Sequence, residues 1–391
     1  MSPRRTPADA PSGDGSVALA HRRVVVKVGT NLLTGGGAEL DAGSLARVAS
    51  DVAEVRRLGG EVIVVSSGAI QAGRERVRGL PAAGDARRSV VSRQALAAIG
   101  QGHLMSAWSD AFEARGVTVA QALLTRRDLA DRLGYLNARN TLLALLAMGV
   151  LPIVNENDVV AVDEIRGSAI GDNDNLSALV ANLVDADLLV LLTDIDGLYT
   201  ADPALDPSAT LIERVEVIDE ALERVAGTAR ERGTGGMVTK LQAARVATQS
   251  GTEVVIASGL VEGTVLDAAC GGAIGTRFAP RGTRLESRRR FLLSGLPVRG
   301  WLSVDEGAAR AVAGGGRSLL PAGIVAVEGS FERGDVVEVR AADGRHLASG
   351  AVNYGAEDIG RIRGLRSDRI IEVLGYEYGD EVIHANNLVV V

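Results

Sequence analysis

The chain contains a single cysteine, Cys270, among its 391 residues. One thiol cannot form a disulfide within the chain, and it cannot hold a zinc ion by itself. A fold that depends on disulfide bonds is therefore excluded. We expect a reducing, cytoplasmic location, and we interpret Cys270, which follows two alanines, as a buried packing residue.

Long apolar runs are also missing. The longest, residues 142–154, is interrupted by Gly149 and Pro152, and it is shorter than the roughly 20 residues that cross a bilayer. Residues 1–16 are rich in Pro, Ser, Gly and Asp and lack the apolar segment of an export signal. We therefore expect no transmembrane segment and a disordered tail over residues 1–20.

The chain has no excess of positive charge. It carries 42 Lys and Arg against 49 Asp and Glu, and its formal net charge is -7. Proteins that bind nucleic acids through their general surface are usually basic, so this balance argues against that function class. Apolar residues reach 46%, and the length suffices for two domains of roughly 100–250 residues.

Residues 21–281 alternate short β-branched runs with alanine-rich stretches. The runs are almost continuously apolar, which predicts parallel strands that are buried on both faces. The predicted strands are 24–28, 62–65, 151–154, 188–192 and 254–256. The predicted helices are 44–58, 91–115, 135–148, 175–184 and 237–250. This order predicts an α/β domain whose mostly parallel sheet is covered by helices on both faces and binds ligands at the carboxyl ends of its strands.

The sequence pattern changes after residue 281. We interpret residues 282–294, which include a short basic run, as a linker. Residues 295–391 show short alternating runs separated by glycines, which predicts a small, separate β-rich domain. Its predicted strands are 300–304, 323–327, 336–340, 347–352 and 372–374, and its predicted helix is 305–313.

Two lysine-containing motifs predict a phosphate site. Lys27 is the last residue but one of the first predicted strand, 24–28, which is followed by Gly29, Thr30 and Asn31. An ammonium and free backbone N–H groups at that edge suit a phosphoryl group, although a lysine extending from a strand end into solvent fits equally well. The spacing is not that of a Walker P-loop.

The second lysine motif, residues 233–240, opens the predicted helix 237–250 with three glycines and ends on Lys240. Glycines allow the backbone to approach a phosphate, and the helix N-terminus adds positive potential. A flexible turn with a surface lysine is the alternative, and the pattern favours phosphate binding.

Four further polar segments follow predicted strands or precede a predicted helix. Residues 65–70 suit an anion or an ordinary turn with a serine cap, and the turn is favoured when this segment is taken alone. Residues 155–158 suit recognition of an ammonium or a hydroxyl. Residues 171–175 are typical of a helix cap, but they contain more polar side chains than a cap needs. Residues 192–199 could hold the base and ribose of a nucleotide.

Six segments in this order resemble the amino-acid kinase family and cover residues 24–244. They are VVKVGTN, VSSGAI, VNENDVV, GDNDNLSAL, LLTDIDGLYTADP and GTGGMVTKLQAA. Residues 304–308 and 319–324 resemble the start of a PUA domain. The resemblance implies an amino-acid kinase fold over residues 21–281 and a PUA domain over residues 295–391.

The resemblance also implies roles for individual residues. The transferring phosphate would contact Lys27 and Lys240, which Asp174 would orient. Glutamate would bind Ser67, Asp158 and Asn173. The implied ATP-binding residues are Lys27, Thr193, Asp194, Thr234, Gly235, Gly236, Met237, Val238, Thr239 and Lys240. Arg166 stands where the family often has a lysine, and its planar guanidinium differs in shape from an ammonium.

Within the family, the match is closest to the branch that phosphorylates the side-chain carboxylate of L-glutamate with ATP and Mg²⁺. That reaction gives L-glutamyl 5-phosphate and begins proline biosynthesis. The resemblance implies proline as feedback inhibitor, a homo-oligomer and a downstream glutamyl-phosphate reductase. The short apolar runs and the acidic net charge predict that neither a membrane nor a nucleic acid is a partner. The alternatives are an acetylglutamate kinase and an RNA-binding PUA protein.

Overall fold

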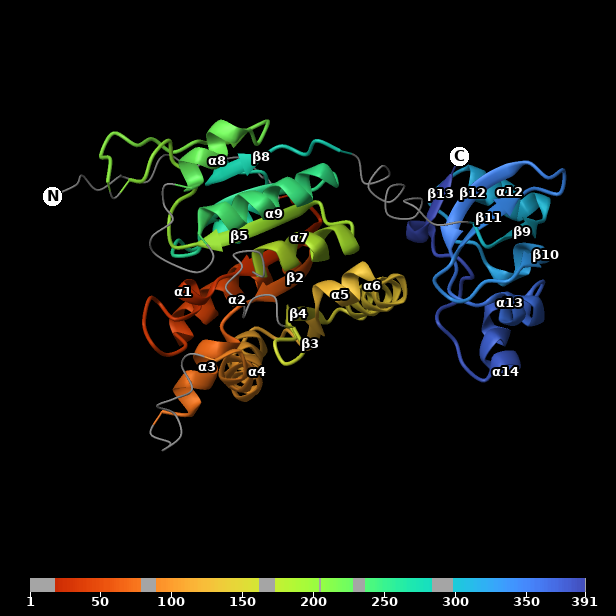
Figure 1. Cartoon of the computed structure of the whole chain (residues 1–391), viewed down its shortest axis with the longest axis horizontal. Coiled ribbons are helices and arrows are strands. Elements are labelled where there is room, and N and C mark those ends of the chain that lie inside the picture. Colours follow the sequence, from red (N-terminus) through yellow and green to blue (C-terminus); the bar gives the residue numbers. More distant parts are fainter. Residues whose placement is uncertain are drawn as a thin grey trace.

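The computed structural model describes residues 18–78, 89–161, 173–203, 205–227, 236–282 and 298–390. Two domains are visible in Figure 1, an α/β domain and a smaller β-rich domain. The predicted tail lies largely outside the described residues and the predicted linker almost entirely so. The domain limits of residues 1–20, 21–281, 282–294 and 295–391 therefore stay predictions.

Eight strands form the sheet of the first domain, in the order β3-β4-β2-β1-β5-β7-β8-β6. All neighbouring pairs are parallel except β7 with β8. The strands are β1 (Arg23–Val28), β2 (Glu61–Ser66), β3 (Val119–Leu124), β4 (Leu151–Glu156), β5 (Leu188–Thr193), β6 (Arg214–Val215), β7 (Glu253–Ser258) and β8 (Thr276–Phe278). The predicted mostly parallel sheet is confirmed, and the five predicted strands are β1, β2, β4, β5 and β7.

Helices cover both faces of this sheet, as predicted (Figure 1). Val24 and Val26 of β1 pack into one core with α2, α4 and α10, while Val25 packs into the other with α6, α7 and α9. Alternate residues of a strand face opposite sides, so a strand between two helix layers must be apolar throughout. The helices are α1 (Thr30–Leu33), α2 (Ala42–Arg57), α3 (Ala69–Arg76), α4 (Val90–Glu113), α5 (Arg126–Ala130), α6 (Arg132–Ala147), α7 (Asn173–Leu183), α8 (Glu220–Gly227), α9 (Met237–Gln249) and α10 (Thr264–Ala269).

The second domain contains a five-stranded sheet with its own core, in the order β10-β9-β11-β12-β13. The strands are β9 (Gly300–Val304), β10 (Ile324–Gly329), β11 (Val336–Arg340), β12 (His346–Ala351) and β13 (Leu388–Val390). The helices are α12 (Glu306–Ala313), α13 (Ala356–Ile362) and α14 (Ile370–Leu374), with short 3₁₀ turns at Pro321–Gly323, Ser367–Arg369 and Ala385–Asn387. The predicted β-rich domain is confirmed.

Two predictions about local structure are wrong. Residues 372–374 were expected to be a strand, but they belong to α14. Ile370 is buried and Val373 and Leu374 are partly buried, and this spacing of three and four residues is that of a helix face. Cys270 is only partly buried, because it caps the end of α10 at the domain surface.

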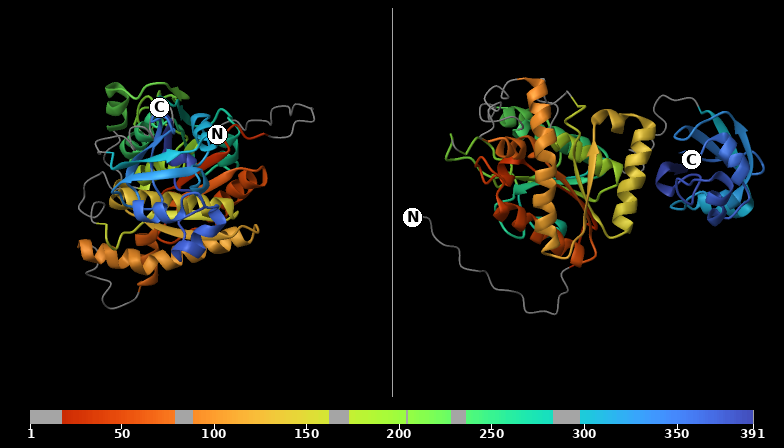
Figure 2. Two further views of the ribbon diagram at one scale, coloured as in Figure 1. Left: turned by 90° about the vertical axis from the view of Figure 1, so that its right-hand side faces the viewer. Right: turned by 90° about the horizontal axis from the view of Figure 1, so that it is seen from below.

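The first domain meets the second through α6, the yellow helix in the right-hand view of Figure 2. Leu136 of α6 is 1% exposed and forms a small apolar cluster with Ala351 and Val389. Gly334 also approaches the first turn of α6, near Leu133. The second domain thus covers apolar surface of the first. Within the described ranges, no helix is long and apolar enough to span a membrane.

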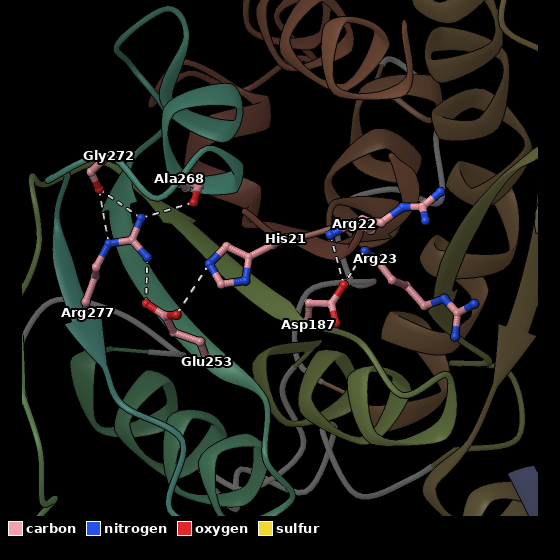
Figure 3. Close-up of polar contacts among 8 residues, drawn as sticks. All are labelled: His21, Arg22, Arg23, Asp187, Glu253, Ala268, Gly272 and Arg277. Atoms are coloured by element: carbon pink, nitrogen blue, oxygen red, sulfur yellow. Dashed lines mark hydrogen bonds and ion pairs between the residues drawn. The ribbon is translucent and has the colours of Figure 1, made fainter. Parts of the chain in front are cut away.

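Polar contacts that range from exposed to partly buried fix the amino ends of the central strands (Figure 3). The Asp187 carboxylate accepts hydrogen bonds from the backbone N–H groups of Arg22 (2.9 Å) and Arg23 (2.7 Å), which joins β1 to β5. Arg277 pairs with Glu253 at 2.6 Å and joins β8 to β7. The residues drawn are His21, Arg22, Arg23, Asp187, Glu253, Ala268, Gly272 and Arg277.

Helices α3 and α4 touch backbone to backbone. A Cβ atom added at Gly73 would lie 1.9 Å from Leu96 O, and one at Gly100 would lie 1.9 Å from Ala69 O. No side chain fits at either position. This contact fixes the start of α3, which directly follows the predicted substrate residue Ser67.

We therefore expect Gly100→Ala to lower the free energy of unfolding of the first domain by about 1–3 kcal/mol, because the added methyl group overpacks the crossing. Gly102→Ala is the matched control on the same helix, where a Cβ would meet nothing within 4 Å. It should leave stability unchanged or raise it by up to about 1 kcal/mol. Urea unfolding measures both variants, and equal effects would contradict the close crossing.

Candidate active site

The predicted site residues that the structure describes gather at the carboxyl edge of the central strands. Lys27 is the fifth residue of β1 and pairs in register with Val65 of β2 and Leu191 of β5. Ser67 directly follows β2, and the 155–158 segment includes the last two residues of β4. Parallel strands bring these ends to one edge of the sheet. Residues as distant in the chain as Lys27 and Asp158 therefore lie at one edge of the sheet.

One carboxylate joins the two predicted lysines. Asp174, in the first turn of α7, lies 2.7 Å from Lys27 Nζ through Oδ1 and 3.2 Å from Lys240 Nζ through Oδ2. The Thr239 hydroxyl donates to the same Oδ2 at 2.7 Å. We refer to Lys27, Asp174, Thr239 and Lys240 as the lysine cluster. It links β1, α7 and α9: α7 contacts both of the other elements, and α7 and α9 lie side by side in Figure 1.

The lysine cluster is buried. Asp174 has no exposed surface, and Lys27 and Lys240 are 3% and 7% exposed. Burial alone would raise the pKa of Asp174, but the charges of Lys27 and Lys240, together with the hydrogen bonds from Lys27 and Thr239, outweigh it and hold the pKa well below its usual range. The cluster therefore contains one negative and two positive charges at neutral pH, and this excess of one positive charge suits an anionic ligand.

Lys27 and Lys240 are also the only two lysines in the sequence, and every other basic residue apart from the four histidines is an arginine. An ammonium is a compact charge with three donors that can point in different directions, whereas a guanidinium is a planar fork. Both ammonium groups of the chain are thus placed on one carboxylate. The sequence motifs predicted the two lysines separately, and the family resemblance implied that Asp174 orients both of them. That the chain has no lysine elsewhere was not part of that prediction.

A second polar group lies next to the lysine cluster, around the start of α3. The Asn173 side-chain N–H donates to Ser67 Oγ at 3.2 Å, and both residues are buried. Asp158, the third predicted substrate residue, is also buried. Ser66 accepts a hydrogen bond from Trp108 Nε1 of α4 at 2.8 Å. Trp108 was missed because a buried tryptophan in an apolar helix gives no sign in the sequence of a polar partner.

The remaining predicted residues divide into two groups. Thr193 ends β5 and Asp194, which is exposed, follows it; the Thr193 hydroxyl donates to Asp194 Oδ1 at 3.1 Å. At the start of α9, Gly236 is the N-cap residue and Met237 and Val238 form the first turn. The first backbone N–H groups of an α-helix have no acceptor within the regular helix ladder, so the α9 N-terminus, which carries Lys240, suits an anionic ligand. The residues Thr234, Gly235 and Arg166 lie outside the described ranges.

This arrangement defines a class of protein: an α/β fold that places two buried ammonium groups and a helix N-terminus at the carboxyl edge of a parallel sheet, without a Walker P-loop. Residues 22–258 match the model of the amino acid kinase family, and residues 300–374 match the PUA domain. The first match covers more than half of the chain. The chain belongs to the amino acid kinase family, and it carries a C-terminal PUA domain.

Comparison with curated proteins gives similarity over nearly the full length. A protein of Dehalococcoides mccartyi named Glutamate 5-kinase is 52% identical over 374 residues, which is 95% of this chain and 99% of that protein. Proteins with the same name from Herpetosiphon aurantiacus and Shewanella sediminis are 52% and 49% identical. These matches cover 94% and 95% of this chain and 98% of each relative.

Asp174→Asn removes the negative charge between two buried ammonium groups. We expect the free energy of unfolding at neutral pH to fall by about 3 kcal/mol or more, because the lysine charges lose their partner. The wild-type pKa is held low, so this stability is fully present above the usual carboxyl pKa and is lost only as the pH falls through the lowered value. The difference between wild type and variant should therefore stay constant from about pH 7 to about pH 5.

Urea unfolding at several pH values measures this difference. Asp110→Asn, an exposed change on α4, is the control and should alter stability by less than about 0.5 kcal/mol. If the difference in the free energy of unfolding between wild type and Asp174→Asn disappears between neutral pH and about pH 5, Asp174 is not held ionised by the lysines.

Proposed function

We propose that this protein transfers the γ-phosphoryl group of MgATP to the side-chain carboxylate of L-glutamate and forms L-glutamyl 5-phosphate. The observation that carries the proposal is the lysine cluster, in which Asp174 contacts both lysines of the chain next to the Ser67–Asn173 pair. The relatives named Glutamate 5-kinase, at about half identity over nearly the whole chain, support the choice of substrate.

The charge of the reactants determines the mechanism. The side-chain carboxylate of glutamate has a reference pKa of about 4.3 and is already ionised at neutral pH. One of its oxygens attacks the γ-phosphorus, the bond from that phosphorus to the β–γ bridging oxygen breaks, and ADP leaves with the electron pair. No proton has to be removed, so no general base is needed. The barrier lies in bringing an anion to a polyanion.

The lysine cluster lowers that barrier by offsetting the repulsion between the two anions. In the proposal Lys27 and Lys240 neutralise charge on the transferring phosphoryl group, and Mg²⁺ arrives with ATP as part of the substrate. Asp174 acts as an organiser, because both of its oxygens are occupied by the lysines and Thr239. In this scheme Ser67, Asp158 and Asn173 bind glutamate, while Thr193, Asp194 and the segment 234–240 bind ATP.

The product is an acyl phosphate, which hydrolyses readily, so we propose that a reductase consumes it directly. This step would begin proline biosynthesis in the cytoplasm, with proline as feedback inhibitor and a homo-oligomer as the working form. An N-acetylated substrate is the alternative within the family. It lacks the free ammonium that the buried carboxylate of Asp158 is proposed to recognise.

Trapping with hydroxylamine tests the substrate, because the acyl phosphate gives a coloured hydroxamate. With MgATP, we expect kcat/KM for L-glutamate to exceed that for N-acetylglutamate by roughly 100-fold or more, since the ammonium site would be left without its partner. Comparable turnover of both substrates, or preference for the acetylated one, would contradict the proposal.

Asp174→Asn separates an organiser from a base in the same assay. Loss of an organiser lowers kcat equally at every pH, whereas loss of a base is offset at high pH by hydroxide. We expect kcat to fall roughly 100-fold or more with no recovery at alkaline pH. Asp110→Asn, on the exposed face of α4, serves as the control that keeps kcat unchanged.

A further inference from the structure

A glutamine beside the proposed glutamate site has an unused donor. Gln101 lies on α4, directly after the glycine at the α3–α4 crossing. Its Oε1 accepts a hydrogen bond from Asn155 Nδ2 at 2.8 Å. Its Nε2 is buried and, among the described residues, has no hydrogen-bond partner. Neither the sequence motifs nor the proposed mechanism uses this side chain.

The orientation of the Gln101 amide follows from a backbone group. The backbone N–H of Glu156 donates to Asn155 Oδ1 at 2.8 Å. A backbone N–H can only donate, so the atom of Asn155 that it contacts must be the oxygen, and the other atom must be the NH₂ group. That NH₂ group requires an acceptor, so the Gln101 atom facing it is Oε1. The Gln101 NH₂ group is thereby left as the unpaired donor.

An unpaired buried donor costs about 1–3 kcal/mol. The protein cannot easily rearrange to give this donor a partner. The backbone before Gln101 is fixed, because Gly100 packs against the backbone of Ala69 and Gly73, and its partner Asn155 is only 2% exposed. A ligand that accepts a hydrogen bond removes this cost. Buried polar groups that lack a protein partner are therefore indicators of a binding site.

A second unpaired group of opposite polarity belongs to Asn173. Its Nδ2 donates to Ser67 Oγ, while its Oδ1 is buried and, within the described ranges, also has no partner. The unpaired group of Gln101 is a hydrogen-bond donor, and that of Asn173 is an acceptor. A free amino acid carries a carboxylate that accepts and an ammonium that donates, so its backbone end matches this pair of groups.

The order of the strands determines which end of the substrate lies here. In the sheet, β2 separates β4 from β1, so Asn155 at the end of β4 lies two strand spacings, roughly 10 Å, from the strand that carries Lys27. The side-chain carboxylate of glutamate must lie at the lysine cluster to receive the phosphoryl group. The α-carbon of the substrate then lies toward β2 and β4, on the side of Gln101.

We propose that the side-chain NH₂ group of Gln101 donates a hydrogen bond to the α-carboxylate of the amino-acid substrate and makes the enzyme specific for a free, ionised α-carboxylate. The inference rests on the proposed function, because it takes glutamate as the substrate. It assigns to α4 a substrate contact next to those of Ser67, Asp158 and Asn173. A purely structural role, in which Gln101 only holds Asn155, requires Oε1 but not the NH₂ group.

The variant Gln101→Glu distinguishes the two roles. It keeps an oxygen that accepts from Asn155 Nδ2, and it replaces the donor by a negatively charged oxygen of similar size. The test compares L-glutamate with its α-amide, which keeps the ammonium and the side-chain carboxylate but has a neutral amide in place of the α-carboxylate. We expect the KM for glutamate to rise roughly 10–100-fold, with kcat and the KM for ATP nearly unchanged.

The α-amide supplies the decisive contrast. Its NH₂ group can donate to the new carboxylate, so its KM should stay constant or fall in Gln101→Glu. The ratio of the two kcat/KM values should therefore shift toward the amide by roughly 10-fold or more. Gln101→Leu, which removes both roles, should raise the KM for glutamate without favouring the amide.

Three outcomes overturn the inference. The first is an unchanged KM for glutamate in Gln101→Glu, and the second is an equal rise for glutamate and for the α-amide, which is what a structural role predicts. The third is a wild-type enzyme that does not phosphorylate glutamate at all, and this result overturns the proposed function as well. If the wild type phosphorylates glutamate but the KM for glutamate is the same in the Gln101 variants, only the role assigned to Gln101 is wrong.

Discussion

A carboxylate with no exposed surface holds two ammonium groups from distant parts of the chain. Lys27 reaches Asp174 from β1 and Lys240 reaches it from α9. Each charge would be costly to bury without the others, so the three groups are stable only together. The constraint extends to the elements that carry them: β1 must be central in the sheet, α7 must start at its carboxyl edge, and α9 must begin beside α7.

This constraint also accounts for the use of basic residues. Arginine supplies every positive side-chain charge outside the site apart from the histidines, and some of these arginines bind buried backbone carbonyls, as Arg139 does with Leu183. The flat, five-donor guanidinium suits such contacts. Only at the lysine cluster, where two cations must share one carboxylate and still face a ligand, does the chain use the smaller ammonium.

Much of the fold could be predicted because the local sequence is consistent with the final packing. The five predicted strands are β-branched runs buried on both faces, and their positions follow from that composition. Strand β3 was missed because Gln121 interrupts its apolar pattern and it lies at the edge of the sheet. Residues 372–374 were misassigned because so short an apolar run suits a strand or one helical turn.

The site was predictable only in part. The two lysines and the polar segments are visible as residues at strand ends and a helix start, so their common edge follows from the rules of parallel sheets. Their shared partner does not follow from those rules, because Asp174 is 147 positions from Lys27 and resembles an ordinary helix-start residue, and only the family resemblance implied that it orients both lysines. Gln101 could not be predicted from the sequence either, because its role depends on the orientation of its side-chain amide, which only contacts in the folded chain define.

Because the chain has two lysines, NMR of protein labelled with ¹³C at the lysine ε-carbon tests the central claim most directly. The account predicts two lysine side-chain signals, both of which shift when MgATP is added. Asp174→Asn should also displace both signals in the absence of nucleotide, because one carboxylate contacts both ammonium groups. A lysine signal that responds to neither MgATP nor Asp174→Asn would contradict the account.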